Sequence, residues 1–353
     1  MIRVLLVEDS ATMRHMLRES LAADPDLRVV GEASDGPAAV EMCARLRPDV
    51  VTMDMMLPTM SGLVATEHIM ADCPTPILVV SGADRRELFS TYNALAAGAV
   101  DVLEKPRGDD SDLSWGLRLR AAVRMVSRIR VITHPRARLD GRSMAPPVAT
   151  HPPAPVAEPL RLVAVGASTG GPGAITELLR TLPPGFRVPV VCVQHIAASE
   201  PFAVAFSDWL AGQTGRDVRY ATNGLPVSIL CGRIVLAPPD RHLFIRDGAL
   251  WLGDGPPRHS CRPAVDVLFE SVAAEYGAAA AGCLLTGMGR DGAQGLLRMR
   301  ERGAVTFAQD ETSCVVYGMP REAAQLGAAA HVLPPGRIAD RLAELVHTAA
   351  ARR

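Results

Sequence analysis

The sequence lacks a net charge of either sign, because 37 lysines and arginines are balanced by 38 aspartates and glutamates. Without an overall basic field, neither nucleic acid nor anionic lipid is expected as a partner. Long apolar runs are also missing, and the N-terminus shows no basic segment followed by an apolar stretch. These absences exclude a bilayer span and a secretion signal, so we expect a cytoplasmic protein that does not insert into membranes.

Paired cysteine motifs are absent as well. The seven cysteines are an odd number, are scattered along the chain and form no CxxC pair. We therefore expect reduced thiols that are mostly buried. Cys192 and Cys283 stand inside apolar runs, where packing in the core is a better interpretation than nucleophilic or zinc chemistry.

Length and proline usage indicate two domains. The chain has 353 residues, too many for one ordinary domain, and its 48% hydrophobic and 21% charged residues are typical of globular proteins. Seven of its 28 prolines stand between residues 134 and 159, a stretch with few large apolar side chains. Such a segment favours extended backbone over a core. We expect domains at 1–125 and 160–348, joined by a proline-rich linker at 126–159.

Short apolar runs alternate with amphipathic helical stretches in both domains. Strands are expected at 2–7, 28–31, 50–53, 77–80 and 100–103, and then at 162–165, 188–193, 234–237, 243–246, 281–285 and 305–308. This alternation predicts an α/β fold with a doubly wound, five-stranded parallel sheet in the first domain. The second domain is expected to be doubly wound with a mostly parallel sheet, and with antiparallel pairing around 243–252.

Polar residues follow successive strands of the first domain. Glu8 and Asp9 end the first expected strand, Asp54 the third, Ser81 the fourth and Lys105 the fifth. The carboxyl ends of parallel strands meet at one edge, where three carboxylates would suit Mg²⁺ and a hydroxyl and an ammonium would suit phosphoryl oxygens. The alternative for each acid alone is a cap on the following helix.

With these five positions, residues 1–125 resemble response-regulator receiver domains of two-component systems. The resemblance implies a flavodoxin-like fold and a phosphoprotein with Asp54 as phosphoryl acceptor, supplied by a histidine kinase. It also implies Mg²⁺ ligands at Glu8, Asp9, Asp54 and the carbonyl of Met56. The switch residues would be Ser81 and Lys105.

The second domain opens with a buried strand that enters a glycine-rich turn, GASTGG at 166–171. Such a turn serves either dinucleotide binding or a nucleophile at a helix N-terminus. The glycines do not have the GxGxxG spacing of a dinucleotide site. Residues 166–170 instead match GxSxG, which makes Ser168 a candidate nucleophile and predicts a helix from about residue 174.

A serine nucleophile needs a histidine base that a carboxylate orients. His195 ends the next apolar run and would share the strand edge of Ser168, whereas His242 and His259 remain open alternatives on sequence alone. Asp291 follows a third strand in a glycine-rich loop and would reach the same edge. Its alternative role is a cap on the helix that begins near residue 293.

Residues 160–348 resemble the catalytic domain of chemotaxis-type protein-glutamate methylesterases. The matching segments are VGASTGG at 165–171, QH at 194–195, APPDRH at 237–242, RPAVDVLF at 262–269, LTGMGRDG at 285–292 and SCVVYGMP at 313–320. The resemblance implies Ser168 as nucleophile, His195 as general base and Asp291 as the group that orients it. Thr169 and Met288 would lie on the oxyanion side, and the hydrolase would need no cofactor.

The resemblance implies a carboxylic ester hydrolase activated by phosphorylation. It would remove methyl esters from glutamates of methylated chemoreceptors in chemotaxis adaptation and release methanol, with glutamine deamidation (protein-glutamine glutaminase) as a second activity. One rival is a receiver fused to a silent domain that docks on receptors, which the set of Ser168, His195 and Asp291 disfavours. Another is a transcription effector, but no basic recognition helix follows the linker.

Overall fold

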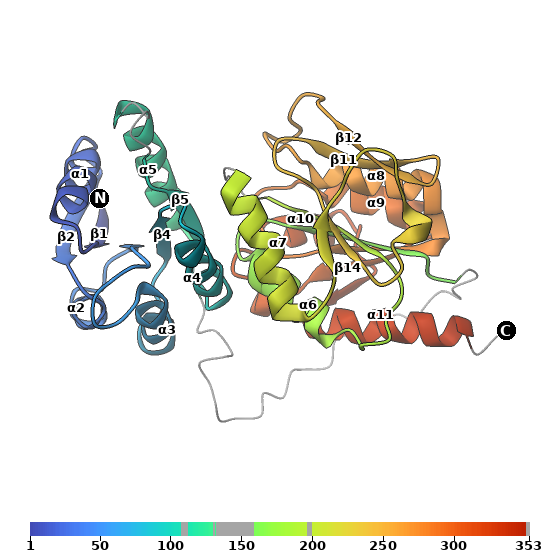
Figure 1. Cartoon of the computed structure of the whole chain (residues 1–353), viewed down its shortest axis with the longest axis horizontal. Coiled ribbons are helices and arrows are strands. Elements are labelled where there is room, and N and C mark those ends of the chain that lie inside the picture. The colour runs from blue at the N-terminus through green and yellow to red at the C-terminus, as the bar shows by residue number, and fades with distance from the viewer. Residues whose placement is uncertain (107–111, 130, 132–158, 196–199, 351–353) are drawn as a thin grey trace. The chain divides into compact units, whose positions relative to one another are not determined.

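The structure, a computed structural model, describes residues 1–106, 112–129, 131, 159–195 and 200–350 (Figure 1). The chain divides into two units, Met1–Arg142 and Ser143–Arg353. Most of the expected linker, residues 132–158, lies outside the described residues. No helix in the described part of the chain is long and apolar enough to cross a bilayer.

The N-terminal unit contains a five-stranded sheet in the order β2-β1-β3-β4-β5, with every pair of neighbours parallel. This confirms the predicted doubly wound fold. The strands are β1 Ile2–Val7, β2 Leu27–Ala33, β3 Val50–Met53, β4 Ile77–Ser81 and β5 Asp101–Glu104. The helices are α1 Ala11–Ala22, α2 Gly36–Leu46, α3 Gly62–Asp72, α4 Arg85–Ala96 and α5 Asp112–Val126. Helices α1 and α5 pack together over one face, and α2, α3 and α4 form the layer on the other (Figure 1).

Helices α1 and α3, which follow the strands that end at the candidate site acids, begin at other polar side chains. Ser10 caps α1 by accepting from Met13 N–H, and Ser61 caps α3 by accepting from Val64 N–H. Such caps satisfy one of the unpaired N–H groups of a first helical turn. The alternative that Glu8, Asp9 and Asp54 serve only as caps is therefore wrong.

The C-terminal unit is built on a seven-stranded sheet in the order β15-β14-β13-β6-β7-β10-β8, again with parallel neighbours throughout. Its strands are β6 Leu162–Ala167, β7 Val190–Gln194, β8 Val218–Tyr220, β10 Ile234–Leu236, β13 Ala280–Leu284, β14 Val305–Gln309 and β15 His331–Leu333. A small antiparallel sheet contains β9 Leu225–Pro226, β11 His242–Arg246 and β12 Ala249–Gly253. Both the mostly parallel sheet and the antiparallel pair near 243–252 are confirmed.

Two helical layers cover the seven-stranded sheet (Figure 1). Helix α6 contacts α7 and α11 on one face, and α9 contacts α8 and α10 on the other. The bounds are α6 Gly171–Thr181, α7 Glu200–Thr214, α8 Val265–Tyr276, α9 Ala293–Glu301, α10 Met319–Gln325 and α11 Pro335–Ala350. Helix α6 starts at Gly171, earlier than predicted, because Pro172 fits the first turn of a helix, where its missing N–H costs nothing.

The strand order creates a switch point at the middle of this sheet. Strand β6 lies between β7 and β13, so the chain leaves β6 toward one edge and later returns on its other side. Ligands of doubly wound sheets collect in the crevice that such a reversal opens at the carboxyl ends. Ser168 directly follows β6, His195 directly follows β7, and Asp291 stands in the loop after β13.

Candidate active site and phosphorylation site

Ser168 lies at the end of the central strand β6, held between two loops. Its N–H donates to Thr286 O at 3.0 Å, and its carbonyl accepts from Gly171 N–H at 2.8 Å and from the Gln194 side-chain amide at 2.8 Å. Gln194 is 8% exposed, so these bonds form away from solvent and hold the turn firmly. The Ser168 side chain is half-buried.

The close approach of the two loops depends on a glycine. A Cβ on Gly287 would lie 2.7 Å from Ser168 Cβ and 2.4 Å from Met319 Sδ, both shorter than any real contact of this kind. Glycine at 287 therefore lets the loop after β13 run directly beside the candidate nucleophile. Met288 directly follows this glycine in the chain.

His195 and Asp291 form the pair that sequence spacing predicted. His195 Nε2 lies 3.0 Å from Asp291 Oδ2, with the two side chains 14% and 3% exposed. Because Nε2 faces the carboxylate, the ring nitrogen left for chemistry is Nδ1. Among the described residues, no hydrogen bond joins the Ser168 hydroxyl to His195; the nearest partner of Nδ1 is Cys261 Sγ, at 3.7 Å.

Asp291 has a second task that the sequence did not reveal. Its Oδ2 also accepts from Val265 N–H at 2.7 Å, and its Oδ1 accepts from Asp266 N–H at 3.0 Å. These are the first N–H groups of α8. The Asp291 carboxylate therefore caps the N-terminus of α8 and not that of α9. The alternative of a cap before Ala293 is wrong, since α9 begins at Ala293 after an N-cap glycine, Gly292, with no side-chain cap.

The pKa values of this pair reflect mutual stabilisation. Burial alone would raise the pKa of Asp291, but the hydrogen bond and charge of His195 and the two α8 N–H groups hold it below its usual value. Burial would lower the pKa of His195, yet the bonds and charges of Asp291 and Cys261 raise it to about 9. The carboxylate is therefore ionised at neutral pH and favours the protonated imidazole.

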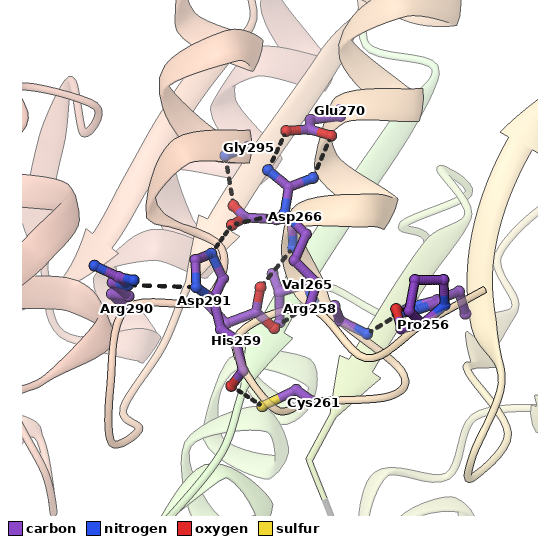
Figure 2. A network of polar contacts seen from close by, with 12 residues as sticks. Pro256, Arg258, His259, Cys261, Val265, Asp266, Glu270, Arg290, Asp291 and Gly295 are labelled. Carbon is purple, nitrogen blue, oxygen red and sulfur yellow. Dashed lines mark hydrogen bonds and ion pairs between the residues drawn. The ribbon is translucent and has the colours of Figure 1, made fainter.

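The two alternative histidines have both ring nitrogens occupied. His242 is buried, with Nε2 3.0 Å from Pro256 O and Nδ1 accepting from Ala264 N–H at 3.2 Å. His259 places Nε2 3.1 Å from Asp266 Oδ2, and its Nδ1 accepts from Arg290 Nε–H at 3.3 Å (Figure 2). Among the described residues, His195 is therefore the one histidine of the three that is hydrogen-bonded to Asp291, although His259 also lies near that carboxylate.

Thr169 directly follows Ser168, and Met288 directly follows Gly287 in the opposite loop. Thr169 O accepts from Thr286 Oγ1 at 2.9 Å, which links the two loops. In the described part of the chain, no hydrogen bond engages the backbone N–H of Thr169 or Met288. Backbone N–H groups without a partner are the kind of donor that an oxyanion requires.

The phosphorylation candidates of the N-terminal unit also converge. Oxygens of Glu8, Asp9 and Asp54 lie within 4.8 Å of one another, and Lys105 Nζ lies 3.1 Å from Glu8 Oε2 and 2.9 Å from Asp54 Oδ1. Glu8 and Asp54 are buried, whereas Asp9 is exposed at the rim. Met56 follows in the same loop, where its N–H donates to Asp54 Oδ1 at 3.4 Å.

The electrostatics of this cluster favour a further cation. Burial, followed by the charge of Asp54, raises the pKa of Glu8 to about 7 although Lys105 opposes the shift. Burial lowers the pKa of Lys105 less than the two carboxylates raise it. Glu8 Oε2 is buried, and Lys105 Nζ at 3.1 Å is the one cation that contacts it among the described residues. An all-oxygen set of three carboxylates beside one ammonium fits Mg²⁺.

Ser81 lies at the same carboxyl edge of the N-terminal sheet, but its hydroxyl contacts a different partner from the acids. It is buried at the end of β4, where its hydroxyl donates to Gly82 O at 3.2 Å and accepts from Thr91 Oγ1 on α4 at 2.8 Å. The structure thus brings Glu8, Asp54 and Lys105 into direct contact, whereas the Ser81 hydroxyl is engaged with α4. Thr91 carries no sequence signal that marks it as this partner.

Comparison with known proteins identifies the family. Residues 163–342 match the family described as CheB methylesterase, and residues 4–114 match the response regulator receiver domain. The chain is 42% identical over 344 residues to protein-glutamate methylesterase/protein-glutamine glutaminase 2 of Anaeromyxobacter dehalogenans (strain 2CP-C), covering 98% of this chain and 97% of that protein. The chain belongs to the CheB methylesterase family.

Two further relatives agree with the family assignment. Protein-glutamate methylesterase/protein-glutamine glutaminase 3 of the same organism is 45% identical over 347 residues, covering 97% of this chain and 98% of that protein. The crystal structure of the Thermotoga maritima CheB methylesterase catalytic domain covers 53% of this chain and 99% of its own, at 32% identity and a TM-score of 0.50.

This CheB-family chain contains a second polar network behind the first, which sequence reasoning missed. Asp266, fully buried, accepts from Gly295 N–H at 2.6 Å through Oδ1 and binds His259 through Oδ2 (Figure 2). Arg258 forms two hydrogen bonds with Glu270, at 2.6 and 2.7 Å. These contacts join the 258–262 loop to α8 and α9. From sequence alone, an aspartate in the first turn of a helix is expected to interact favourably with the positive end of the helix dipole. The contacts of Asp266 with α9 and His259 could therefore not be predicted.

An open groove of about 790 Å³ adjoins the candidate site of this family member. It is lined by His259, Ser260, Met288, Gly289, Arg290, Val316, Tyr317, Gly318, Arg321 and Glu322. Met288 lines this groove and directly follows Gly287, the residue that approaches Ser168. A groove of this size accepts an extended or helical segment of a protein chain.

Proposed function

We propose that this chain is a phosphorylation-activated protein-glutamate methylesterase that releases methanol from methylated chemoreceptors, and that it also deamidates receptor glutamines. The observation that carries the proposal is the buried His195–Asp291 pair at the switch point of the sheet, beside Ser168. The names of the relatives, each a methylesterase and glutaminase, support the substrate class. The proposal locates the chain in the cytoplasm, where receptor methylation sites and a histidine kinase would meet it.

The proposed reaction begins with attack of Ser168 Oγ on the ester carbonyl of a receptor glutamate. His195 Nδ1 accepts the hydroxyl proton, while Nε2–H remains bonded to Asp291. Substrate binding must bring Ser168 Oγ into the place that Cys261 Sγ now has beside Nδ1, by rotation of side chains. Catalytic hydrogen bonds of unliganded enzymes are often incomplete in this way.

The remaining steps use the same groups. The N–H groups of Thr169 and Met288 stabilise the oxyanion of the tetrahedral intermediate. Its collapse breaks the bond to the methoxy group, which takes the proton from His195 and leaves as methanol. Water then attacks the acyl-serine, and His195 returns a proton to Ser168 as the receptor carboxylate departs. A glutamine substrate follows the same course with ammonia as the leaving group.

For the regulatory half, we propose that residues 1–125 form a receiver domain, 126–159 a linker and 160–348 the catalytic domain. A histidine kinase would phosphorylate Asp54. Mg²⁺ would be held by Glu8, Asp9, Asp54 and the Met56 carbonyl, and when bound it supplies positive charge against the phosphoryl oxygens. Lys105 already contacts Asp54 and would hold one phosphoryl oxygen. Ser81 would reach another after release from Thr91, which couples phosphorylation to α4.

Methanol release from methylated receptor membranes tests the proposal. The Ser168→Ala variant is expected to lose ester hydrolysis by about a thousandfold or more while keeping the unfolding midpoint of the unsubstituted chain. Ser207→Ala on α7 is a matched control, because within the described residues that hydroxyl bonds to Val204 O of its own helix. Unchanged turnover in Ser168→Ala would refute the mechanism. Receptor binding without any methanol release would favour the silent docking domain.

A further inference from the structure

Cys261 has no role in the proposed reaction, although it lies beside the catalytic base of that reaction. Its Sγ lies 3.7 Å from His195 Nδ1, the nitrogen that faces away from Asp291. Cys261 is partly exposed, whereas the other described cysteines are buried except for Cys231, which is exposed. The ligand atoms of His195, Cys261 and Asp291 all lie within 4.8 Å of one another.

The separation of the nitrogen and the sulfur matches metal coordination. Zinc bonds of about 2.0–2.1 Å to nitrogen and about 2.3 Å to sulfur, set at a tetrahedral angle, place the two atoms about 3.6 Å apart. The observed 3.7 Å therefore needs almost no movement of either side chain. The ring is also oriented as in metal sites, where a carboxylate binds the other histidine nitrogen and fixes the tautomer.

The turn that carries Cys261 is held in place before any ligand arrives. Arg258 and Cys261 exchange two backbone hydrogen bonds, of 3.0 and 2.8 Å, around His259 and Ser260, which have φ values of 50° and 64°. Two consecutive positive φ values define a tight turn that non-glycine residues adopt only under constraint. The constraint comes from the Glu270 bonds of Arg258 and the Asp266 bond of His259 (Figure 2).

We propose that His195 Nδ1 and Cys261 Sγ together bind a soft divalent cation, Zn²⁺ above all, and that the bound metal inhibits the hydrolase. Binding releases the thiol proton to solvent and requires the unprotonated Nδ1, while water completes the tetrahedron. The metal inhibits because it occupies the nitrogen that must accept the serine proton. The inhibition rests on the proposed function of His195, whereas the binding does not.

The chain would thus bind Mg²⁺ and Zn²⁺ at two different sites, because the ligand atoms of the two sites differ. The cluster of Glu8, Asp9 and Asp54 offers only oxygen and suits Mg²⁺, whereas the pair of His195 and Cys261 offers imidazole and thiolate, which Mg²⁺ binds poorly. Excess Mg²⁺ is therefore expected to occupy the first site without reaching the second. This difference makes the two sites separable in one protein.

Cobalt is the probe for the binding step, because a thiolate bound to Co²⁺ gives a near-ultraviolet charge-transfer band. The full chain is titrated with Co²⁺ in excess Mg²⁺. One equivalent is expected to produce the band in the unsubstituted chain and in Cys231→Ser, and Zn²⁺ is expected to displace it. Cys261→Ser, which keeps the size of the side chain, is expected to show no band. A band that persists in Cys261→Ser, or its absence from the unsubstituted chain, overturns the proposed site.

Methanol release with added Zn²⁺ tests the inhibition separately. Activity of the unsubstituted chain and of Cys231→Ser is expected to fall with Zn²⁺ and to return with a chelator. In Cys261→Ser, the Zn²⁺ concentration for half-inhibition is expected to rise at least about tenfold, measured against that variant's own metal-free rate. Metal binding with undiminished activity would overturn the inhibition. A chain that shows the cobalt band but never releases methanol would contradict the proposed function and leave the metal site standing.

Discussion

The protonation of His195 predicts a steep pH dependence of ester hydrolysis. As a base, His195 must have an unprotonated Nδ1, yet its pKa is raised to about 9 by Asp291 and Cys261 against the opposing effect of burial. A group with this pKa is unprotonated in only about 1% of molecules at pH 7. The rate should therefore rise about tenfold per pH unit above neutrality and level off near pH 9.

The variant Cys261→Ser separates the two causes of this shift. The thiol contributes both a hydrogen bond and a charge that raise the pKa of His195, while the contribution of Asp291 remains. The inflection of the pH profile is thus expected at lower pH in the variant than in the unsubstituted chain. At pH 7 more molecules would contain the free base, so the rate per enzyme would increase.

The assay is methanol release between pH 6 and 10, with a chelator present and with the rate of Ser168→Ala subtracted at each pH to remove spontaneous ester hydrolysis. A profile that is flat between pH 7 and 9 would refute the argument about His195. An inflection that does not move in Cys261→Ser would show that the thiol has no influence on the base.

Three further predictions concern other parts of the chain. Asp54→Ala is expected to lose labelling by a small-molecule phosphodonor with Mg²⁺ but to keep the basal hydrolase; labelling that persists would place the acceptor elsewhere. Gly287→Ala is expected to lower methanol release about tenfold or more, because the added Cβ would lie 2.7 Å from Ser168 Cβ. As a control, Gly212→Ala should leave methanol release unchanged, since no atom lies within 4 Å of its added Cβ. Asp266→Ala leaves buried donors unpaired and should cost about 2–3 kcal/mol in urea unfolding of the C-terminal unit, and a change below 0.5 kcal/mol would contradict that role.

The parallel direction of the strands was enough to predict that three residues meet at one edge of the sheet: Ser168, His195 and Asp291. Each residue follows an apolar run, and parallel strands end at the same edge whatever their order in the sheet. The same reasoning placed Glu8, Asp54 and the other receiver candidates. The edge strands β8 and β15 were missed because three residues at the border of a sheet carry too little apolar periodicity to stand out.

What could not be predicted lies in the loops, where no periodicity constrains the path. Cys261 faces His195 only because two residues of positive φ turn the chain back between Arg258 and Cys261. Asp291 closes α8, which begins 26 residues earlier in the chain, as its bond to Val265 N–H shows. Such contacts depend on how separate elements pack, and local sequence does not determine them.

Asp291 binds both His195 and the first N–H groups of α8, which explains why the candidate site depends on that helix. A carboxylate buried to 3% exposure remains ionised only if donors compensate for lost water, and the two N–H groups at the positive end of α8 are such donors. They leave the oxygen facing Nε2 negative, so His195 is oriented and its imidazolium is stabilised when it takes the serine proton. Because α8 is in turn joined to α9 through Asp266, the charge that the reaction uses is stabilised by the packing of two helices behind the crevice.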